Sequence, residues 1–314
     1  MNPIVVCRLP NHVSDCCMAL PALRLLEASG FTPFLVGKRF TENLMLGMGW
    51  RIDPIEGHVT EDLERLYYLR KLLKRPRGLL FPNSFTSALQ FALAGIPATG
   101  YATDARSLIL TKRIAPPKEP LHTVERMFTL VHEAIRAWGA TPSHDKVPQA
   151  LGLRLAQRHL SGAKNLKKAF AIPESYAVIA PIARGLYRGQ TRHWLEINSV
   201  VQTLRDFGIE PVVFPAEDDV QAARIACPDA RHLPPTNLGT FAAILKGAKI
   251  VIANDSGASH VAAAVGVRQL TIFGVSPVWK DRPWNPNAQI VGSEDGWPDV
   301  ASVQEKLAGM LAEG

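Results

Sequence analysis

Short runs of apolar, mostly β-branched residues recur along the chain, and segments with helical periodicity separate them. The clearest runs are IVVCRL (4–9), FTPFLVG (31–37), RGLLFP (77–82), YAVIAP (176–181), EPVVFPA (210–216), KIVIAND (249–255) and QLTIFG (269–274). Because these runs are almost continuously apolar, they are typical of strands buried on both faces. Such strands, alternating with helices, predict an α/β protein with parallel, doubly wound sheets.

The intervening helices are expected at residues 15–29, 65–75, 86–95, 195–207, 219–226 and 300–312. A further helix is expected to follow the strand at 249–255 and to end at Val265. A chain of 314 residues exceeds the usual size of one domain. The strand–helix pattern is interrupted by a more polar stretch over residues 141–173 and then restarts. We therefore predict two Rossmann-like domains, residues 1–170 and 171–314, with a ligand cleft between them at the C-terminal ends of the strands.

The 35 basic and 28 acidic residues give a net charge of +7. This balance suits an anionic partner but does not distinguish nucleic acid, phosphorylated sugars and a membrane surface. The four cysteines have no C-x-x-C spacing, which favours a reduced cytosolic protein over a disulfide framework or a zinc site. The opening MNPIVVCRLP is expected to be a first strand and not a signal peptide. The sequence has no apolar run of about 18 residues, the length needed to span a membrane.

The stretch NDSGASHVAAAVG (254–266) places polar groups between a strand and an alanine-rich helix. Asp255 is expected to be the N-cap of this helix. The free amides of Ser256, Gly257 and Ala258 would present a partial positive charge to an anion, and Gly257 would let the anion approach the backbone. From chemistry alone, a capped core helix with a satisfied polar His260 is an equal alternative.

The same stretch, extended as NDSGASHVAAAVGVRQLTIFG, closely resembles the D-[ST]-G-x-x-H-x-A-A-A-x-G segment of the ADP-heptose lipopolysaccharide heptosyltransferases, glycosyltransferase family 9. FPNSFTSALQFALAGIPATGY (81–101) and RLPNHVSDCCMALPALRLLE (8–27) resemble the second-heptosyltransferase branch of that family. The matches extend to about residue 283. The resemblance implies the glycosyltransferase B fold, with an acceptor-binding N-terminal domain and a nucleotide-sugar-binding C-terminal domain.

The resemblance also implies roles for donor-binding residues. In the family, the positions of Asp255, Ser256, Gly257 and His260 surround the diphosphate of the nucleotide sugar. TRHWL (191–195) resembles the family's K-[RH]-W-P. Arg192 then stands where a lysine usually meets the phosphates, a tolerable change because arginine can bind phosphate in a bidentate manner.

Trp194 takes the supporting position in that motif. Glu217 matches an acid that accepts hydrogen bonds from the donor ribose. The run Glu217, Asp218, Asp219 leaves this register uncertain by one residue, and a solvated acidic turn is the alternative.

Inverting glycosyl transfer needs a base for the incoming hydroxyl and stabilisation of the departing diphosphate. Asp15 matches the catalytic-base position of the family; its alternative role is a helix N-cap or first-turn acid. The family usually has glycine just before this acid, where the chain has Ser14. If that position requires positive φ or a close approach of the donor, serine would cost about 1 kcal/mol or crowd the pocket.

Six basic side chains are concentrated over residues 65–77: Arg65, Arg70, Lys71, Lys74, Arg75 and Arg77. Together with the opening motif, this cluster leads us to expect acceptor binding by Arg8, Asn11, Lys74 and Arg75. This basic cluster would suit the phosphates and acidic sugars of a lipopolysaccharide inner core, or anionic lipid headgroups. A solvated helix face is the alternative.

The sequence has no D-x-D pair for a divalent metal, so side chains are expected to neutralise the diphosphate, and no cofactor is expected. The resemblance thus implies an inverting, metal-independent glycosyltransferase that moves heptose from ADP-heptose to a lipopolysaccharide core acceptor. Cytoplasmic location, peripheral contact with the anionic inner membrane and no nucleic-acid partner are expected.

Two other functions stay open: a family member with a different donor or acceptor, and a non-catalytic nucleotide-sugar-binding homologue, which Ser14 would favour. A dinucleotide oxidoreductase fits less well, because LPNHVSD follows the first strand in place of G-x-G-x-x-G.

Overall fold

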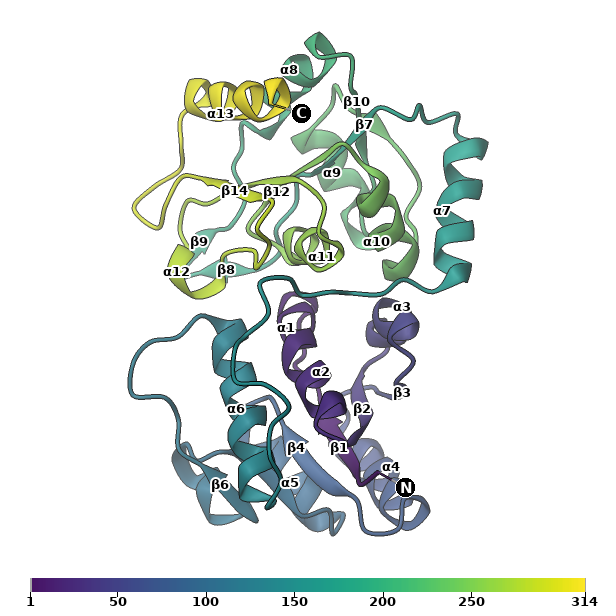
Figure 1. Cartoon of the computed structure of the whole chain (residues 1–314). Coiled ribbons are helices and arrows are strands. Elements are labelled where there is room, and N and C mark those ends of the chain that lie inside the picture. The colour runs from purple at the N-terminus through teal and green to yellow at the C-terminus, as the bar shows by residue number, and fades with distance from the viewer. Residues whose placement is uncertain (1, 314) are drawn as a thin grey trace. The chain divides into compact units, whose positions relative to one another are not determined.

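The computed structural model describes residues 2–313 and divides into two compact units, Met1–Pro148 and Gln149–Gly314. Each unit contains one six-stranded sheet whose neighbouring strands are all parallel (Figure 1). The two doubly wound domains predicted from the alternation of strands and helices are confirmed.

The sheet of the first unit has the strand order β3-β2-β1-β4-β5-β6. Its strands are β1 (Ile4–Arg8), β2 (Thr32–Lys38), β3 (Arg51–Ile55), β4 (Arg77–Leu80), β5 (Ala98–Tyr101) and β6 (Lys112–Ile114). The connections contain α1 (Val13–Met18), α2 (Leu20–Ala28), α3 (Phe40–Met45), η1 (Leu46–Met48), α4 (Val59–Leu72), α5 (Phe85–Leu93), η2 (Asp104–Leu108) and α6 (Thr123–Ala137). The chain winds from β1 to one edge and then returns to build the other half from β4. The ends of β1 and β4 therefore form a topological switch point.

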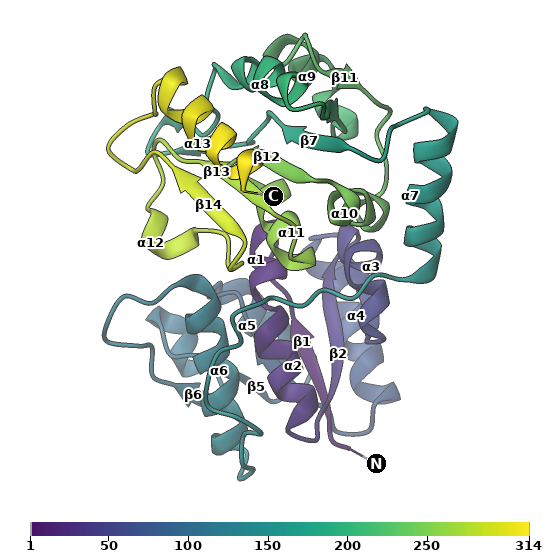
Figure 2. The same ribbon diagram turned by 45° about the horizontal axis from the view of Figure 1, so that its top comes forward.

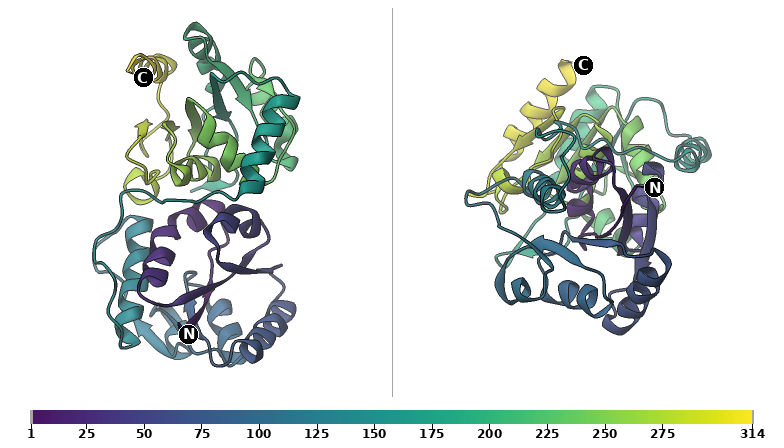
Figure 3. Two further views of the ribbon diagram at one scale, coloured as in Figure 1. Left: turned by 45° about the vertical axis from the view of Figure 1, so that its right-hand side comes forward. Right: turned by 60° about the horizontal axis from the view of Figure 1, so that its bottom comes forward.

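Helices cover both faces of this sheet. On one face α4 and α5 contribute Leu66, Leu69 and Phe91 to a buried cluster with Val6 and Leu80 of the central strands. Helices α2 and α6 pack against each other on the opposite face (Figure 3, left). Double coverage explains why the strands are apolar along nearly their whole length.

The second unit repeats the topology, with the order β11-β10-β7-β12-β13-β14 and a switch point between β7 and β12. Its strands are β7 (Tyr176–Ala180), β10 (Glu210–Val213), β11 (Arg231–His232), β12 (Ile250–Asn254), β13 (Gln269–Ile272) and β14 (Ala288–Val291), with a separate hairpin β8 (Leu186–Tyr187) and β9 (Gln190–Thr191). Its helices are α7 (Gln157–Ala169), η3 (Ile197–Ser199), α8 (Val200–Asp206), η4 (Glu217–Asp219), α9 (Val220–Ala226), α10 (Leu238–Gly247), α11 (Gly257–Val265), α12 (Val278–Asp281) and α13 (Val300–Ala312).

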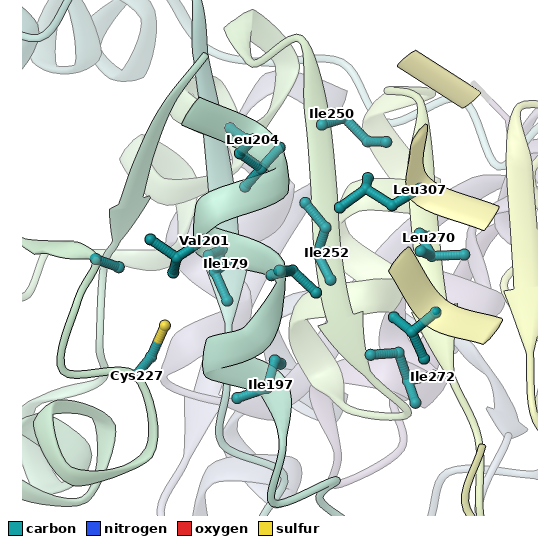
Figure 4. Packing of buried hydrophobic residues seen from close by; sticks show 14 of the residues in the cluster. Ile179, Ile197, Val201, Leu204, Cys227, Ile250, Ile252, Leu270, Ile272 and Leu307 are labelled. Carbon is teal, nitrogen blue, oxygen red and sulfur yellow. The ribbon is translucent and has the colours of Figure 1, made fainter. Parts of the chain in front are cut away.

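The core of the second unit lies between the sheet and α8 and α13. Val201 and Leu204 of α8 and Leu307 of α13 pack onto Ile252 and Leu270 of the central strands (Figure 4). Helices α10 and α11 cover the other face (Figure 2). Ala262, Ala263 and Ala264 of α11 are buried, as expected for close packing on the sheet.

Several elements differ from the sequence analysis. The first expected helix is two helices, α1 and α2, which meet at Ala19 just before Pro21, a residue that has no amide hydrogen to donate within a helix. The basic helix expected at 65–75 is α4, which begins at Val59 and ends at Leu72. Helix α6 was missed, although its apolar residues recur at helical spacing and it is strongly amphipathic.

The boundary between the units lies at Pro148, before the expected boundary at residue 170. Helix α7 packs against α10 of the second unit, and the amide of Leu153 donates to the carbonyl of Ala264 at 2.9 Å. These contacts join residues 149–170 to the second unit, whereas the sequence analysis followed a change in composition.

Candidate functional site

Both polar clusters singled out in the sequence lie at switch points. Asn254 ends β12 and Asp255 follows it, next to the end of β7. In the first unit Asp15 lies in α1, directly after β1, which pairs with β4. In doubly wound sheets, ligands bind outside the carboxyl ends of the strands at such points.

Asp255 is the centre of the cluster in the second unit. Its side chain is only 2% exposed, and its Oδ2 accepts hydrogen bonds from Ser276 Oγ at 2.5 Å and from Arg192 Nη2. His260 Nε2 lies 3.8 Å from Asp255 Oδ1. The chain thus gathers Arg192, Asp255 and His260, as the sequence analysis expected.

The protonation of Asp255 reflects these neighbours. Burial by itself raises the pKa of the carboxyl, but His260, Arg192 and the Ser276 hydroxyl outweigh it and lower the pKa to about 2. Asp255 is therefore ionised at neutral pH. A buried carboxylate paired in this way holds the Arg192 guanidinium in one orientation.

Four buried atoms of this cluster have no hydrogen-bond partner within residues 2–313: Arg192 Nε, Asp255 Oδ1, Ser256 Oγ and His260 Nδ1. Buried polar atoms are nearly always satisfied in native proteins. Unsatisfied donors and acceptors at a strand end indicate a place for a polar ligand.

The start of α11 differs by one residue from the expectation. Ser256, not Asp255, is the N-cap, and the Asp255 carboxylate is engaged instead by Arg192 and Ser276. The Ser259 hydroxyl accepts from the Ser256 amide at 3.4 Å and donates to its carbonyl at 2.8 Å. Gly257 is the first residue of the nine-residue helix, so its amide contributes to the positive end of the dipole.

Two residues of this network were missed by the sequence analysis. The side chain of Asn254 donates to the Pro181 carbonyl at 2.7 Å and accepts from the Trp194 amide at 3.0 Å, so it ties the segment carrying Arg192 to the sheet. Ser276 follows β13 by a few residues. Its position after a strand end was the available signal, because parallel strands end at the same edge.

Glu217 begins η4 after β10, at the same edge as Asp255, and is exposed. Its neighbours Asp218 and Asp219 form ion pairs with Arg184, at 3.3 and 2.9 Å. Within residues 2–313, Glu217 forms no ion pair. Of the three acids considered for donor binding, Glu217 is the one whose carboxylate is not engaged by a cation.

In the first unit, Asp15 is half-buried in the first turn of α1. The residue before it, Ser14, is helical and is not among the residues with positive φ. Serine therefore has no conformational cost at this position, and the expected penalty does not arise.

The four expected acceptor residues fall into two groups. Arg8 ends β1, is buried and donates to Asn11 Oδ1 at 2.8 Å, at the edge that carries Asp15. Lys74 and Arg75 precede β4 and thus lie at the opposite edge of the same parallel sheet. The structure does not bring Lys74 and Arg75 together with Asp15.

A further arginine was not singled out by the sequence. Arg106 of η2 is 1% exposed; its Nη1 donates to the Pro82 carbonyl at 2.6 Å and to Asn83 Oδ1 at 3.2 Å. Its Nε and Nη2 have no partner within the described chain, and burial lowers its pKa. A buried guanidinium without a carboxylate, beside the end of β4, is a candidate for binding an anion.

Within residues 2–313, no group of three or more His, Cys, Asp or Glu side chains is placed to hold a metal ion. In the same part of the chain, no helix is long and apolar enough to cross a membrane. The four cysteines are buried, free thiols.

Residues 66–309 match the model of glycosyltransferase family 9 (heptosyltransferase). Lipopolysaccharide heptosyltransferase 2 of Escherichia coli K12 is 27% identical over 241 residues, which cover 71% of this chain and 67% of that protein.

Among solved structures, E. coli ADP-heptose lipopolysaccharide heptosyltransferase II superposes with a TM-score of 0.80 at 24% identity, over 99% of both chains. A family 9 glycosyltransferase from Veillonella parvula DSM 2008 gives a TM-score of 0.81 at 14% identity, over 99% of this chain and 98% of the other. The fold is therefore that of the glycosyltransferase B class, as the resemblance implied.

The charge cluster generates a prediction about pH. Because the folded pKa of Asp255 is below its ordinary value of 3.8, the pairing stabilises the second unit above about pH 4. This stabilisation, about 2 kcal/mol for a shift of this size, should be lost as the pH falls from about 4 to 2. Urea unfolding of the parent and Asp255→Asn should show a difference that shrinks over this range. A difference independent of pH would contradict it.

Proposed function

The chain belongs to glycosyltransferase family 9, the heptosyltransferase family, and we propose that it transfers heptose from ADP-heptose to a lipopolysaccharide inner-core acceptor, with inversion and without a metal ion. The observation that carries the proposal is the buried cluster of Arg192, Asp255 and His260 at the N-terminus of α11. The related enzyme of E. coli is an ADP-heptose lipopolysaccharide heptosyltransferase.

On the donor side, positive charge comes from the chain itself. The α11 amides and the guanidinium of Arg192 face the developing charge of the departing diphosphate. Asp255 acts indirectly: its carboxylate is negatively charged and would repel an anion, and it instead orients Arg192. Ser256, Gly257 and His260 line the same helix start, and Glu217 would accept from the donor ribose.

On the acceptor side, Asp15 acts as general base. Its carboxylate takes the proton of the acceptor hydroxyl as that oxygen forms a bond to the anomeric carbon. The bond from that carbon to the diphosphate oxygen breaks, and the diphosphate leaves with the electron pair. Attack opposite the leaving group inverts the anomeric configuration.

The acceptor would be held at the same edge of the first sheet. Arg8 and Asn11 lie beside Asp15 in the chain, and Arg106 lies beside the end of β4, the strand next to β1. The unpartnered nitrogens of Arg106 fit a carboxylate or phosphate of an acidic core sugar. Because they are shielded from solvent, binding would require η2 to shift.

Buried free thiols support a reducing compartment, the cytoplasm. The conformational argument for the non-catalytic alternative fails, since Ser14 is accommodated in α1 without positive φ.

The donor is tested first. Calorimetry with ADP-, UDP- and GDP-sugars and with NAD should show preferential binding of the ADP-sugar, which Arg192→Ala weakens about 10-fold or more through the loss of charge-assisted hydrogen bonds. Arg205→Ala, which removes an exposed arginine of α8, is the matched control. Preferential binding of UDP-sugars would exclude ADP-heptose as the donor.

The base is tested by Asp15→Asn. The amide keeps the shape but cannot accept the proton, so turnover should fall by about two to four orders of magnitude while donor affinity is retained. Stability should change by no more than about 1 kcal/mol, the contribution of a first-turn acid. Near-normal turnover in the folded variant would remove Asp15 from this role.

The acceptor site is tested by Arg106→Met, which replaces a buried cation by an apolar chain of similar length. We expect the KM for the acceptor to rise roughly 10- to 100-fold, as for the loss of hydrogen bonds to a charged group, with donor affinity unchanged. If Arg106 only fills space, the variant should be as stable as the parent or more so, with unchanged acceptor KM.

A further inference from the structure

The end of α4 and the loop after it expose both aromatic and basic side chains. We call Tyr67, Tyr68, Lys71, Leu72, Lys74 and Arg75 the basic–aromatic corner. Tyr68 is 64% exposed and Leu72 is 53% exposed, which is unusual for large apolar side chains on a helix that also packs on the core. Tyr68, Lys71 and Leu72 share one face because they are three and four residues apart.

Half of the cations over residues 65–77 are engaged by the fold of the first unit. Arg65 pairs with Asp53 at 2.5 Å, and Arg70 donates to the Gly95 carbonyl at 3.0 Å. Arg77 lies against the rings of Phe31 and Trp138. The solvated-face alternative therefore does not explain these three.

The other three cations belong to the corner. Lys71 lies 4.5 Å from the ring centre of Tyr67, while Lys74 and Arg75 are exposed and form no salt bridge within residues 2–313. The nearest acid in the chain is Glu64, which is exposed on α4, and no salt bridge within residues 2–313 joins it to these three cations. The corner thus carries an excess of positive charge beside exposed aromatic rings.

The backbone at Lys74 and Arg75 is an independent observation. Their φ angles are +47° and +66°, so two consecutive residues with long side chains adopt the left-handed conformation. This conformation is unfavourable for residues with a Cβ atom and is the usual place for glycine. Conformation alone would favour glycine here, yet the chain has two cations.

We propose that the basic–aromatic corner is a docking surface for an anionic lipid bilayer. Clusters of lysine and arginine bind anionic headgroups, and tyrosine is favoured at the membrane–water interface because its ring is apolar and its hydroxyl is polar. The corner offers both within two helical turns, with Leu72 as the apolar contact.

The corner lies at the opposite end of the first unit's sheet from Asp15, so we do not assign it to the reaction site. Helix α4 begins at the edge of the sheet that carries Asp15 and ends at the opposite edge. Its 14 residues span about 21 Å. The docking itself does not depend on the proposed function.

Vesicle flotation with Lys74→Gly/Arg75→Gly tests the proposal. The parent should bind phosphatidylglycerol-containing vesicles better than pure phosphatidylcholine vesicles, and more strongly at low than at high salt. The double variant should bind the anionic vesicles roughly 30-fold more weakly, since each cation near the surface contributes about fivefold. Its melting temperature should be equal to or above that of the parent, because glycine relieves the left-handed strain.

Two further variants make the outcome specific. Lys164→Gln/Lys168→Gln removes two exposed lysines from α7, another basic helix, and should retain vesicle affinity. Tyr68→Ser/Leu72→Ser should weaken binding at both low and high salt, because it removes apolar contacts. Equal loss in the α7 control, or full affinity in the glycine variant, would overturn the proposal.

Activity separates this proposal from the proposed function. Turnover with a water-soluble, delipidated acceptor should be the same for the parent and the glycine variant. A parent that binds vesicles but turns over no nucleotide sugar would contradict the function and leave the docking surface intact. If soluble-acceptor KM rises in the glycine variant while vesicle binding is unchanged, the corner binds acceptor and the docking proposal fails.

Discussion

The parallel arrangement of the central strands is the constraint on which the rest of the structure depends. In each unit all strands of the six-stranded sheet end at one edge, and the winding reverses between two central strands. That reversal leaves the ends of β1 and of β12 uncovered by a crossover. Polar residues after these two strands, Asp15 and Asp255, are therefore brought to positions where ligands can reach the sheet edge, although the strands themselves are buried.

Within the second unit, a buried carboxylate organises its surroundings. The Asp255 carboxylate accepts hydrogen bonds from Arg192 and Ser276. Asp255 lies one residue before the N-cap of α11, which is Ser256. Isolated, such a charge would be costly to bury, but its partners keep it ionised. An acid that follows a strand end can thus act indirectly, by fixing the orientation of a neighbouring cation.

The positive charge of the first unit is divided between two edges of one sheet. Arg8 and Arg106 are buried at the edge that carries Asp15, while Lys74 and Arg75 are exposed at the other. Buried, unpaired guanidinium nitrogens suit a specific anionic group, whereas exposed cations beside aromatic rings suit an extended anionic surface. A count of basic residues treats these four cations alike, and only their positions in the fold separate them.

The sequence by itself determined the class of fold and the segment around Asp255. Continuous apolar runs predict strands that are buried on both faces. The spacing of Asp255, Ser256, Gly257 and His260 is local in the sequence, so neither of these two predictions needed tertiary information. Contacts between distant segments were decided by the tertiary structure: Ser276 and Asn254 enter the cluster across strands, and Arg106 lies against residues 82 and 83. The same holds for the boundary at Pro148, because the packing of α7 on α10 cannot be read from local composition.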